Sequence, residues 1–145
     1  VLLHVGRYRK RWTIEEFFKA LKTGCSLEQR QMESAAAMLK VLALMLPVAW
    51  QMLLVRSLAE AAPDASWNVV VTPLQKNLLA ASLPRFGLDD HSTVADILLA
   101  IGALGGHLKR NGRPGWQVLA RGLLRLRDLE AGARLLSSPS SEAAT

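Results

Sequence analysis

The stretch Ala35–Ala61, AAAMLKVLALMLPVAWQMLLVRSLAEA, decides the fold. It is dense in Leu, Met, Ala and Val, a pattern that is typical of a core helix. Its most apolar part is only fifteen residues long, lies between Lys40 and Arg56, and contains Pro47 and Gln51. Because a bilayer needs about 20 consecutive apolar residues, the pattern favours a buried helix, kinked at its proline, over a membrane span.

The composition of the whole chain also favours helix. Its 145 residues suit one domain, half of them are apolar, and only 6% are aromatic. β-Branched residues are sparse outside residues 69–71, which form either a strand or an extended linker. We therefore predict a mainly α-helical chain.

The charge and the cysteine content indicate the chemical class of the partner and the cellular compartment. Eighteen Lys and Arg against twelve Asp and Glu give a net charge of +6, which favours nucleic acid or an anionic membrane surface. The single cysteine, Cys25, excludes an internal disulfide and a cysteine-based zinc cluster, and the first residues do not form a cleavable signal peptide. We expect a reducing cytosol. Because the chain begins with Val1, we also expect it to be a fragment.

Capping and turn residues predict further helices. The first runs over residues 8–22 and is ended by Thr23-Gly24, after which Ser26 is a candidate N-cap. Another begins with Thr72 as N-cap and Pro73 in the first turn, and ends at about residue 83.

The C-terminal third is predicted to be a helical hairpin. Residues 90–92 can cap a helix that reaches about residue 107, and a basic turn over 109–115 precedes a last helix over 116–134. Residues 137–145 are rich in Ser and Ala and are predicted to be a disordered tail.

Five polar residues lie on one side of the first predicted helix. At about 100° per residue they fall within an arc of roughly 80°, and they are Tyr8, Arg11, Glu15, Lys19 and Lys22. An apolar stripe runs beside them, formed by Ile14, Phe17, Phe18 and Leu21. The carboxylate can bind a hard divalent cation, and the other four groups can hold phosphates. Geometry alone favours a simpler interpretation, a solvated face with an ordinary Arg11–Glu15 ion pair.

The spacing of four of these residues resembles a known signature. Tyr8-x2-Arg11-x3-Glu15-x6-Lys22 matches, at all three spacings, the tyrosine–arginine–glutamate–lysine signature of the insertion-sequence-four transposases, the group that contains the Tn-five-like enzymes. The surrounding residues 11–17, 19–24 and 28–33 are also similar to family sequence. Farther along, the likeness rests on order and spacing, at Val71-Thr72-Pro73, Leu104-Gly105-Gly106 and Gly115-Trp116, which resemble the family's C-terminal dimerisation region.

The resemblance implies an architecture and a chemistry. Residues 1–34 would contain the final, catalytic helix of an RNase-H-like α/β core, and residues 35–136 would form an all-helical dimerisation domain. In that family two aspartates and one glutamate bind two Mg²⁺ or Mn²⁺ ions, and Glu15 matches the glutamate. Tyr8, Arg11, Lys19 and Lys22 would contact the transposon-end DNA. A metal-activated water would cut the end, and the new 3′-hydroxyl would attack the other strand and later the target DNA.

The family's two aspartates should lie upstream of the signature. All five aspartates of this chain follow Glu15, namely Asp64, Asp89, Asp90, Asp96 and Asp128. We therefore expect the chain to be inactive in DNA cleavage by itself.

The remaining chemistry-bearing residues give weaker signals. His4, His91 and His107 share no metal-ligand spacing, so no zinc site is predicted. Cys25, near a helix boundary, is expected to be structural, although such a place can lower a thiol pKa. Residues 107–127 hold six Lys and Arg and no acid, which suits either DNA backbone contact or a merely soluble basic face.

An apolar stripe in the last predicted helix suggests an interface. Trp116, Leu119, Leu123 and Leu126 follow one another at near-heptad spacing, which fits either intramolecular core or a partner-facing seam. Because the resemblance implies a homodimer, we assign these four residues to dimerisation.

The resemblance favours a fragment of a bacterial, cytoplasmic, nucleoid-associated transposase. Its partners would be transposon ends, target DNA and a second copy, with no membrane and no small-molecule cofactor. Two other functions stay open, namely a non-catalytic truncated transposase that inhibits by dimerising, and an inert remnant.

Overall fold

The chain is mainly helical, as predicted. The computed structural model describes residues 2–108 and 112–137, without the side chains of residues 2–10 and 28. The elements are α1 (Leu2–Lys19), the π-helical turn η1 (Ala20–Gly24), the 3-10 turn η2 (Leu27–Gln29), α2 (Ala35–Ala61), η3 (Trp67–Val69), α3 (Pro73–Ser82), η4 (Pro84–Phe86), α4 (Val94–Leu104) and α5 (Trp116–Ser137). These residues contain no strand, only an isolated bridge between Ser66 and Thr93, so no RNase-H-like sheet is among them.

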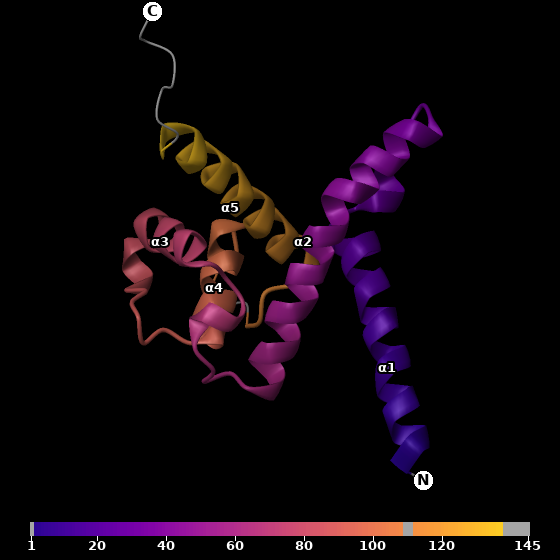
Figure 1. Cartoon of the computed structure of the whole chain (residues 1–145), viewed down its shortest axis with the longest axis horizontal. Helices are drawn as coiled ribbons and strands as arrows, with labels where there is room; N and C mark the ends of the chain where they lie inside the picture. The colour runs from indigo at the N-terminus through magenta and orange to yellow at the C-terminus, as the bar shows by residue number, and fades with distance from the viewer. Residues whose placement is uncertain (1, 109–111, 138–145) are drawn as a thin grey trace, which may run out of the picture.

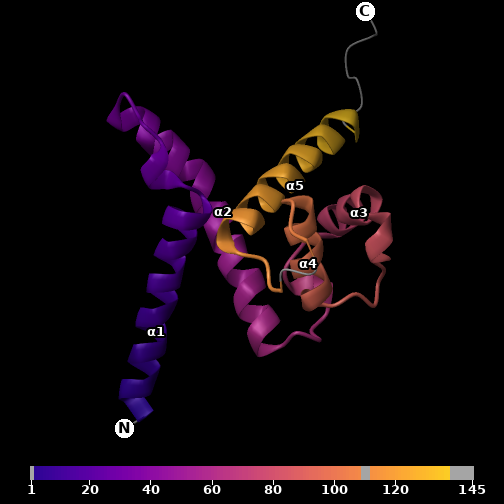
Figure 2. The same ribbon diagram turned by 180° about the vertical axis from the view of Figure 1, so that it is seen from behind.

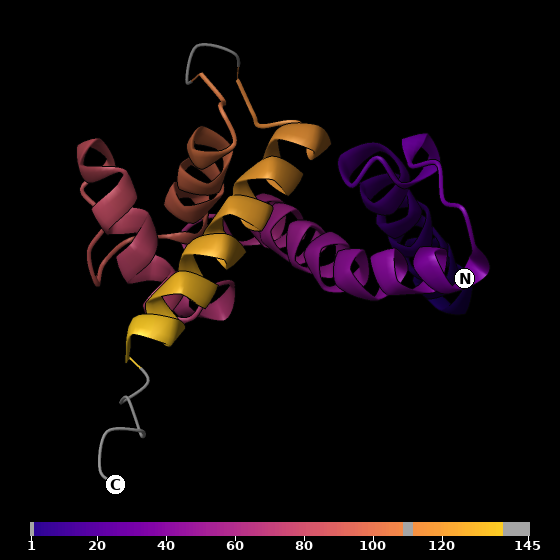
Figure 3. The same ribbon diagram turned by 90° about the horizontal axis from the view of Figure 1, so that it is seen from above.

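The helices form a bundle with one projecting arm. Helices α3, α4 and α5 gather around the C-terminal half of α2, whereas α1 lies on the other side of the molecule (Figures 1 and 3). Seen from behind, α1 leaves α2 at an angle and carries the N-terminus away from the bundle (Figure 2). Helix α1 contacts the rest of the chain mainly through η1 and α2. It therefore forms an arm, which carries most of the polar strip, the name used below for Tyr8, Arg11, Glu15, Lys19 and Lys22.

The core of the bundle is closed by the four other helices. Its largest fully buried side chains come from α2, α3, α4 and α5, and include Met52, Leu79, Ile97, Ile101 and Leu119. Helices α4 and α5 cross in backbone contact, because a Cβ on Gly122 would lie 2.0 Å from the Ile101 carbonyl oxygen. A Cβ on Gly105 would lie 1.9 Å from the Val118 carbonyl oxygen. These glycines therefore set the distance between the two helices.

Helix α2 has the predicted bounds but only half of the predicted burial. Ser34 caps it, since its side chain accepts a hydrogen bond from the Ala37 amide at 3.2 Å, and Pro47 lies within it. Its C-terminal half supplies core, whereas Leu39 and Leu44 are exposed. Within the described residues α2 is the one helix long and apolar enough to cross a membrane, a test that soluble core helices also pass.

Two of the predicted caps are wrong. Ser26 has a left-handed backbone and its side chain caps nothing in η2. Helix α4 is capped by Thr93, which forms a capping box with Asp96. The expected cap, residues 90–92, instead belongs to a turn that Asp89 stabilises, accepting from the His91 amide at 2.8 Å. An Asx turn satisfies the same backbone donors that an N-cap would.

The cap of α3 is confirmed. The Thr72 hydroxyl accepts from the Gln75 amide and the Gln75 side chain accepts from the Thr72 amide, both at 3.2 Å, and Pro73 opens the helix. Residues 69–71 are not a strand, because η3 turns the chain into this cap.

The α5 stripe lies in the intramolecular core, the first of its two predicted interpretations. Trp116, Leu119, Leu123 and Leu126 are all buried within the chain, in contact with the other core helices. The stripe therefore belongs to intramolecular core. Helix α5 continues past the predicted end to Ser137, and the rest of the predicted disordered tail, 138–145, lies outside the described residues.

Candidate nucleic-acid interface

The polar strip lies on the exposed side of α1 where that helix approaches the bundle. Arg11 donates from Nε to Glu15 Oε1 at 3.0 Å, and both side chains are largely exposed. This is the i,i+4 ion pair of the simpler interpretation, and such exposed pairs contribute about 0.3–0.5 kcal/mol. Because so weak a pair exchanges easily, Glu15 stays accessible to other cations and Arg11 to phosphate.

Three of the predicted site residues meet around one open hollow. Its lining consists of Glu15, Phe18, Lys19, Lys22 and Thr23. Lys19 also lies 3.8 Å from Glu16 Oε1, a weak second ion pair on the neighbouring side. The structure thus brings together one carboxylate and two ammonium groups, with Arg11 reaching the same carboxylate. The side chain of Tyr8 is outside the described residues.

A π turn places Lys22 beside the hollow. The helical run ends at Gly24, as predicted, but its last turn is π-helical, and the Cys25 amide donates to the Ala20 carbonyl at 3.0 Å. Such i→i+5 turns are rare and frequent at functional sites. The turn rotates Lys22 relative to an ideal α-helix, yet it still lines the hollow with Glu15 and Lys19.

The same turn fastens the strip to the bundle. Ala20, Leu21 and Cys25 are buried. A Cβ on Gly24 would lie 2.8 Å from Met52 Cε and 3.3 Å from the Trp116 carbonyl oxygen, so only glycine fits this approach without displacing a neighbour. The arm is therefore anchored at the end that carries Lys22.

The residues in hand do not fit a divalent-metal site by themselves. Within the described part of the chain, no three His, Cys, Asp or Glu side chains gather to hold a metal ion. Three of the aspartates have local structural roles instead: Asp89 stabilises a turn, Asp90 pairs with Lys76, and Asp96 caps α4. Glu15 is thus one ligand, and a metal bound there needs further oxygen ligands from elsewhere.

The apolar stripe of α1 is divided between the core and the surface. Leu21 is buried and Phe17 packs against the core, whereas Ile14 and Phe18 are more than half exposed. Trp12 is also exposed on this helix. Three large apolar side chains beside a polar strip form a surface that further protein can cover.

The surroundings of Cys25 and His107 indicate structural roles for both residues. Burial raises the pKa of the Cys25 thiol, outweighing the opposite effect of Arg30, so the thiol stays protonated and unreactive. His107 Nε2 lies 2.7 Å from the Gly112 carbonyl oxygen, a turn contact. Neither residue is placed to act on DNA.

Some described cations of the basic segment 107–127 have partners within the chain. Arg113 pairs with Glu60 at 2.6 Å, Arg125 donates to the Leu104 carbonyl at 2.7 Å, and Arg127 is half-buried. Residues 109–111, which include two of its cations, lie outside the described residues. Of its four described cations, Arg113 and Arg125 therefore bind acceptors of the same chain.

Sequence patterns missed two neighbours of the hollow and a second concave surface. The sequence places Phe18 in an apolar stripe and Thr23 at a helix end, yet both line the hollow. A separate groove lies beside Trp50 and Arg127. The available signal for it was an aromatic and an amide side chain, Trp50 and Gln51, in an otherwise apolar helix.

In comparisons with known proteins, no family model matches the chain and no curated protein matches it significantly.

Proposed function

We propose that the chain is the C-terminal part of a cut-and-paste DNA transposase of the insertion-sequence-four type. In this proposal Glu15 is one of the carboxylates that hold Mg²⁺ or Mn²⁺, and Tyr8, Arg11, Lys19 and Lys22 hold the transposon end. The supporting observation is the single hollow that Glu15, Lys19 and Lys22 share. Two of the four signature residues, Glu15 and Lys22, line it together with Lys19.

The chemistry of the hollow suits a phosphodiester strand. Lys19 and Lys22 present ammonium groups that attract phosphate oxygens without reading base sequence. Arg11 can exchange its exposed carboxylate partner for a phosphate, which accepts the same forked hydrogen bonds. Glu15 lines the same hollow and would lie beside the bound strand, where a metal ligand is useful. The exposed apolar side chains of α1 support further protein on this side of the helix, where the other metal ligands would be supplied.

A second copy is part of the proposal, at a surface different from the buried stripe. The distal half of α5 exposes Leu129, Leu135 and Leu136, and an apolar groove between α3 and α5 lies beside them, lined in part by Leu78 and Ala133. Two such surfaces are self-complementary if they meet about a two-fold axis. This surface equally supports the alternative, a truncated chain that dimerises with an intact transposase and inhibits it.

The DNA-binding part is tested by duplex binding at several salt concentrations. Lys19→Ala and Lys22→Ala should each weaken binding and flatten the plot of log K against log salt by about 0.9, the value for one lost phosphate contact. Glu15→Gln should bind at least as tightly as the wild type, since it removes a negative charge from the strip.

Lys40→Ala is the matched control, because Lys40 is an exposed lysine on α2, outside the hollow. An equal loss in this control would mean that the chain attracts DNA by net charge alone. Unchanged slopes in both hollow variants would contradict the proposal.

A further inference from the structure

A groove on the bundle combines an exposed indole with amide side chains and a guanidinium. It lies between α2 and the segment that enters α3, and its lining includes Trp50, Gln51, Asn68, Pro73, Gln75 and Arg127. Its volume is about 570 Å³, within the range of roughly 300–1,000 Å³ that small-molecule sites occupy. No Asp or Glu is among the residues that line it.

Arg127 is the unsatisfied group of this groove. Its side chain is half-buried, its Nε is buried without a hydrogen-bond partner, and no ion pair links it to any residue that the structure describes. The nearby Glu130 attracts Arg127 electrostatically but gives it no hydrogen bond, because the Glu130 oxygens bind Arg134 at 2.7 Å and Gln75 at 2.9 Å. A buried donor without an acceptor is costly, and here that donor is the Arg127 Nε–H. An anionic ligand would remove that cost.

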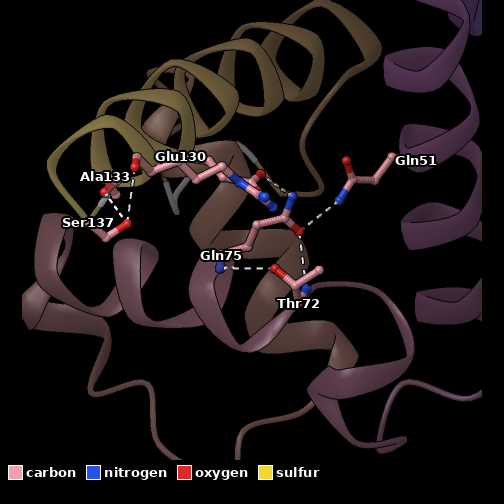
Figure 4. A network of polar contacts seen from close by, with 7 residues as sticks. Gln51, Thr72, Gln75, Glu130, Ala133 and Ser137 are labelled. Atoms are coloured by element: carbon pink, nitrogen blue, oxygen red, sulfur yellow. Dashed lines mark hydrogen bonds and ion pairs between the residues drawn. The ribbon is translucent and has the colours of Figure 1, made fainter. Parts of the chain in front are cut away.

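The floor of the groove is held rigid by a chain of amide hydrogen bonds (Figure 4). Gln75 Oε1 accepts from the Thr72 amide at 3.2 Å and from Gln51 Nε2 at 3.4 Å, while Gln75 Nε2 donates to Glu130. Gln51 Oε1 accepts no hydrogen bond from the described residues and is available to a donor on a ligand. Amide groups fixed in this way recognise the polar edge of a planar ring.

Trp50 supplies a stacking surface beside this floor. It is 61% exposed although it lies in the middle of an apolar helix, and Pro47 and Pro73 also line the groove. An exposed indole is a platform on which a nucleobase stacks, contributing about 1–3 kcal/mol per base.

We propose that this groove binds one nucleotide of an unpaired DNA strand, with the base stacked on Trp50, its edge near Gln51, and a phosphate at Arg127. The inference rests on the proposed function, since it takes DNA as the partner and adds a second, single-stranded site to it. The net charge of +6 and the absence of acids from the lining suit a polyanion. An acidic peptide would satisfy Arg127 but would have no use for the indole and the amide floor.

The test compares a fluorescent ten-nucleotide oligothymidine with an abasic strand of the same length, using the whole chain. Trp50→Ala should weaken binding of the oligothymidine about tenfold and leave binding of the abasic strand unchanged, because only the base stacks. Trp50→Phe should recover most of the loss. Arg127→Gln should weaken both strands and flatten the salt slope by about 0.7, one phosphate contact on a single strand.

The controls are an exposed tryptophan on α1 and an exposed arginine on α5, changed in Trp12→Ala and Arg121→Gln. Both should bind both strands like the wild type. If Trp12→Ala loses as much as Trp50→Ala, or if Trp50→Ala is silent, the groove is not the site. If Trp50→Ala and Arg127→Gln instead lose binding of a polyglutamate peptide and not of the strand, the ligand is protein.

Folding and the proposed function are checked separately. Circular dichroism identifies a variant that unfolds, and if Arg127→Gln does so, the two Trp50 variants decide the matter. Duplex binding through Lys19 and Lys22 is expected to survive in Trp50→Ala. If Trp50→Ala binds oligothymidine like the wild type while Lys22→Ala weakens duplex binding, the proposal for the groove is contradicted and the transposase proposal is retained.

Discussion

At the scale of the residue, Gly122 determines how closely α4 and α5 pack. A Cβ at this position would lie 2.0 Å from the Ile101 carbonyl oxygen and 3.1 Å from Ile101 Cγ2, and a backbone carbonyl cannot move aside as a flexible side chain does. We expect Gly122→Ala to lower the free energy of unfolding by about 3 kcal/mol, as overpacking does. Urea denaturation followed by circular dichroism measures it.

Gly132→Ala is the control in the same helix, because a Cβ there meets nothing within 4 Å. It should leave stability unchanged or raise it by roughly 0.5–1 kcal/mol, the helix preference of Ala over Gly. Equal effects at the two positions would mean that α4 and α5 are not in backbone contact at Gly122.

Single residues were predictable where their signal is local. Thr72-Pro73 identified a cap because Thr, Pro and Gln75 act within one turn. The α4 cap was misplaced because Asp89, Ser92 and Thr93 are all capable of accepting from nearby amides, and sequence alone does not show which of them begins the helix. Glu15, Lys19 and Lys22 were expected on one side, and they line one hollow despite the unforeseen π turn.

At the scale of the element, α5 has a buried half and an exposed half. Leu123 is 1% exposed and Leu136 is 91% exposed. We expect Leu123→Glu to unfold the chain, since it buries an unpaired charge, and to lose most helical circular dichroism. Leu136→Glu should keep the helical signal and weaken the proposed dimer, because a two-fold contact repeats the charge.

Sedimentation at micromolar concentration and circular dichroism measure both variants of α5. A folded, dissociated Leu123→Glu would restore the stripe to a dimer seam and contradict the structure. A wild type that sediments as a monomer would contradict the dimer proposal instead.

Helix α5 also shows what periodicity leaves open. Spacing identifies which residues share a face, so the stripe of Trp116, Leu119, Leu123 and Leu126 was found. Spacing does not identify what that face contacts, and here α2 and α4 of the same chain cover it. For α2 the bounds were right, but its N-terminal half is covered on one side alone: Cys25 lies against Met45 there, whereas Leu39 and Leu44 are exposed.

At the scale of the whole molecule, Glu15 is the candidate metal ligand, and the described residues do not gather further ligands around it. We expect no Mg²⁺- or Mn²⁺-dependent cleavage of supercoiled plasmid by the chain alone, because hard cations need several oxygen ligands held together. Gel electrophoresis after incubation with either metal detects nicking. Nicking that co-purifies with the chain and disappears in Glu15→Gln would contradict this expectation and require ligands that the structure does not bring together.

Because the π turn is anchored at Gly24, a tilt of α1 would displace each of its residues in proportion to the distance from that anchor. Glu15 lies seven residues from Lys22, about 10 Å along a helix, so a tilt of about 10° shifts the carboxylate by about 2 Å while Lys22 hardly moves. A misplacement of about 1 Å in an active site can cost about a hundredfold in rate. The packing of Ala20 and Gly24 in the bundle therefore determines the position of the Glu15 carboxylate, several residues away.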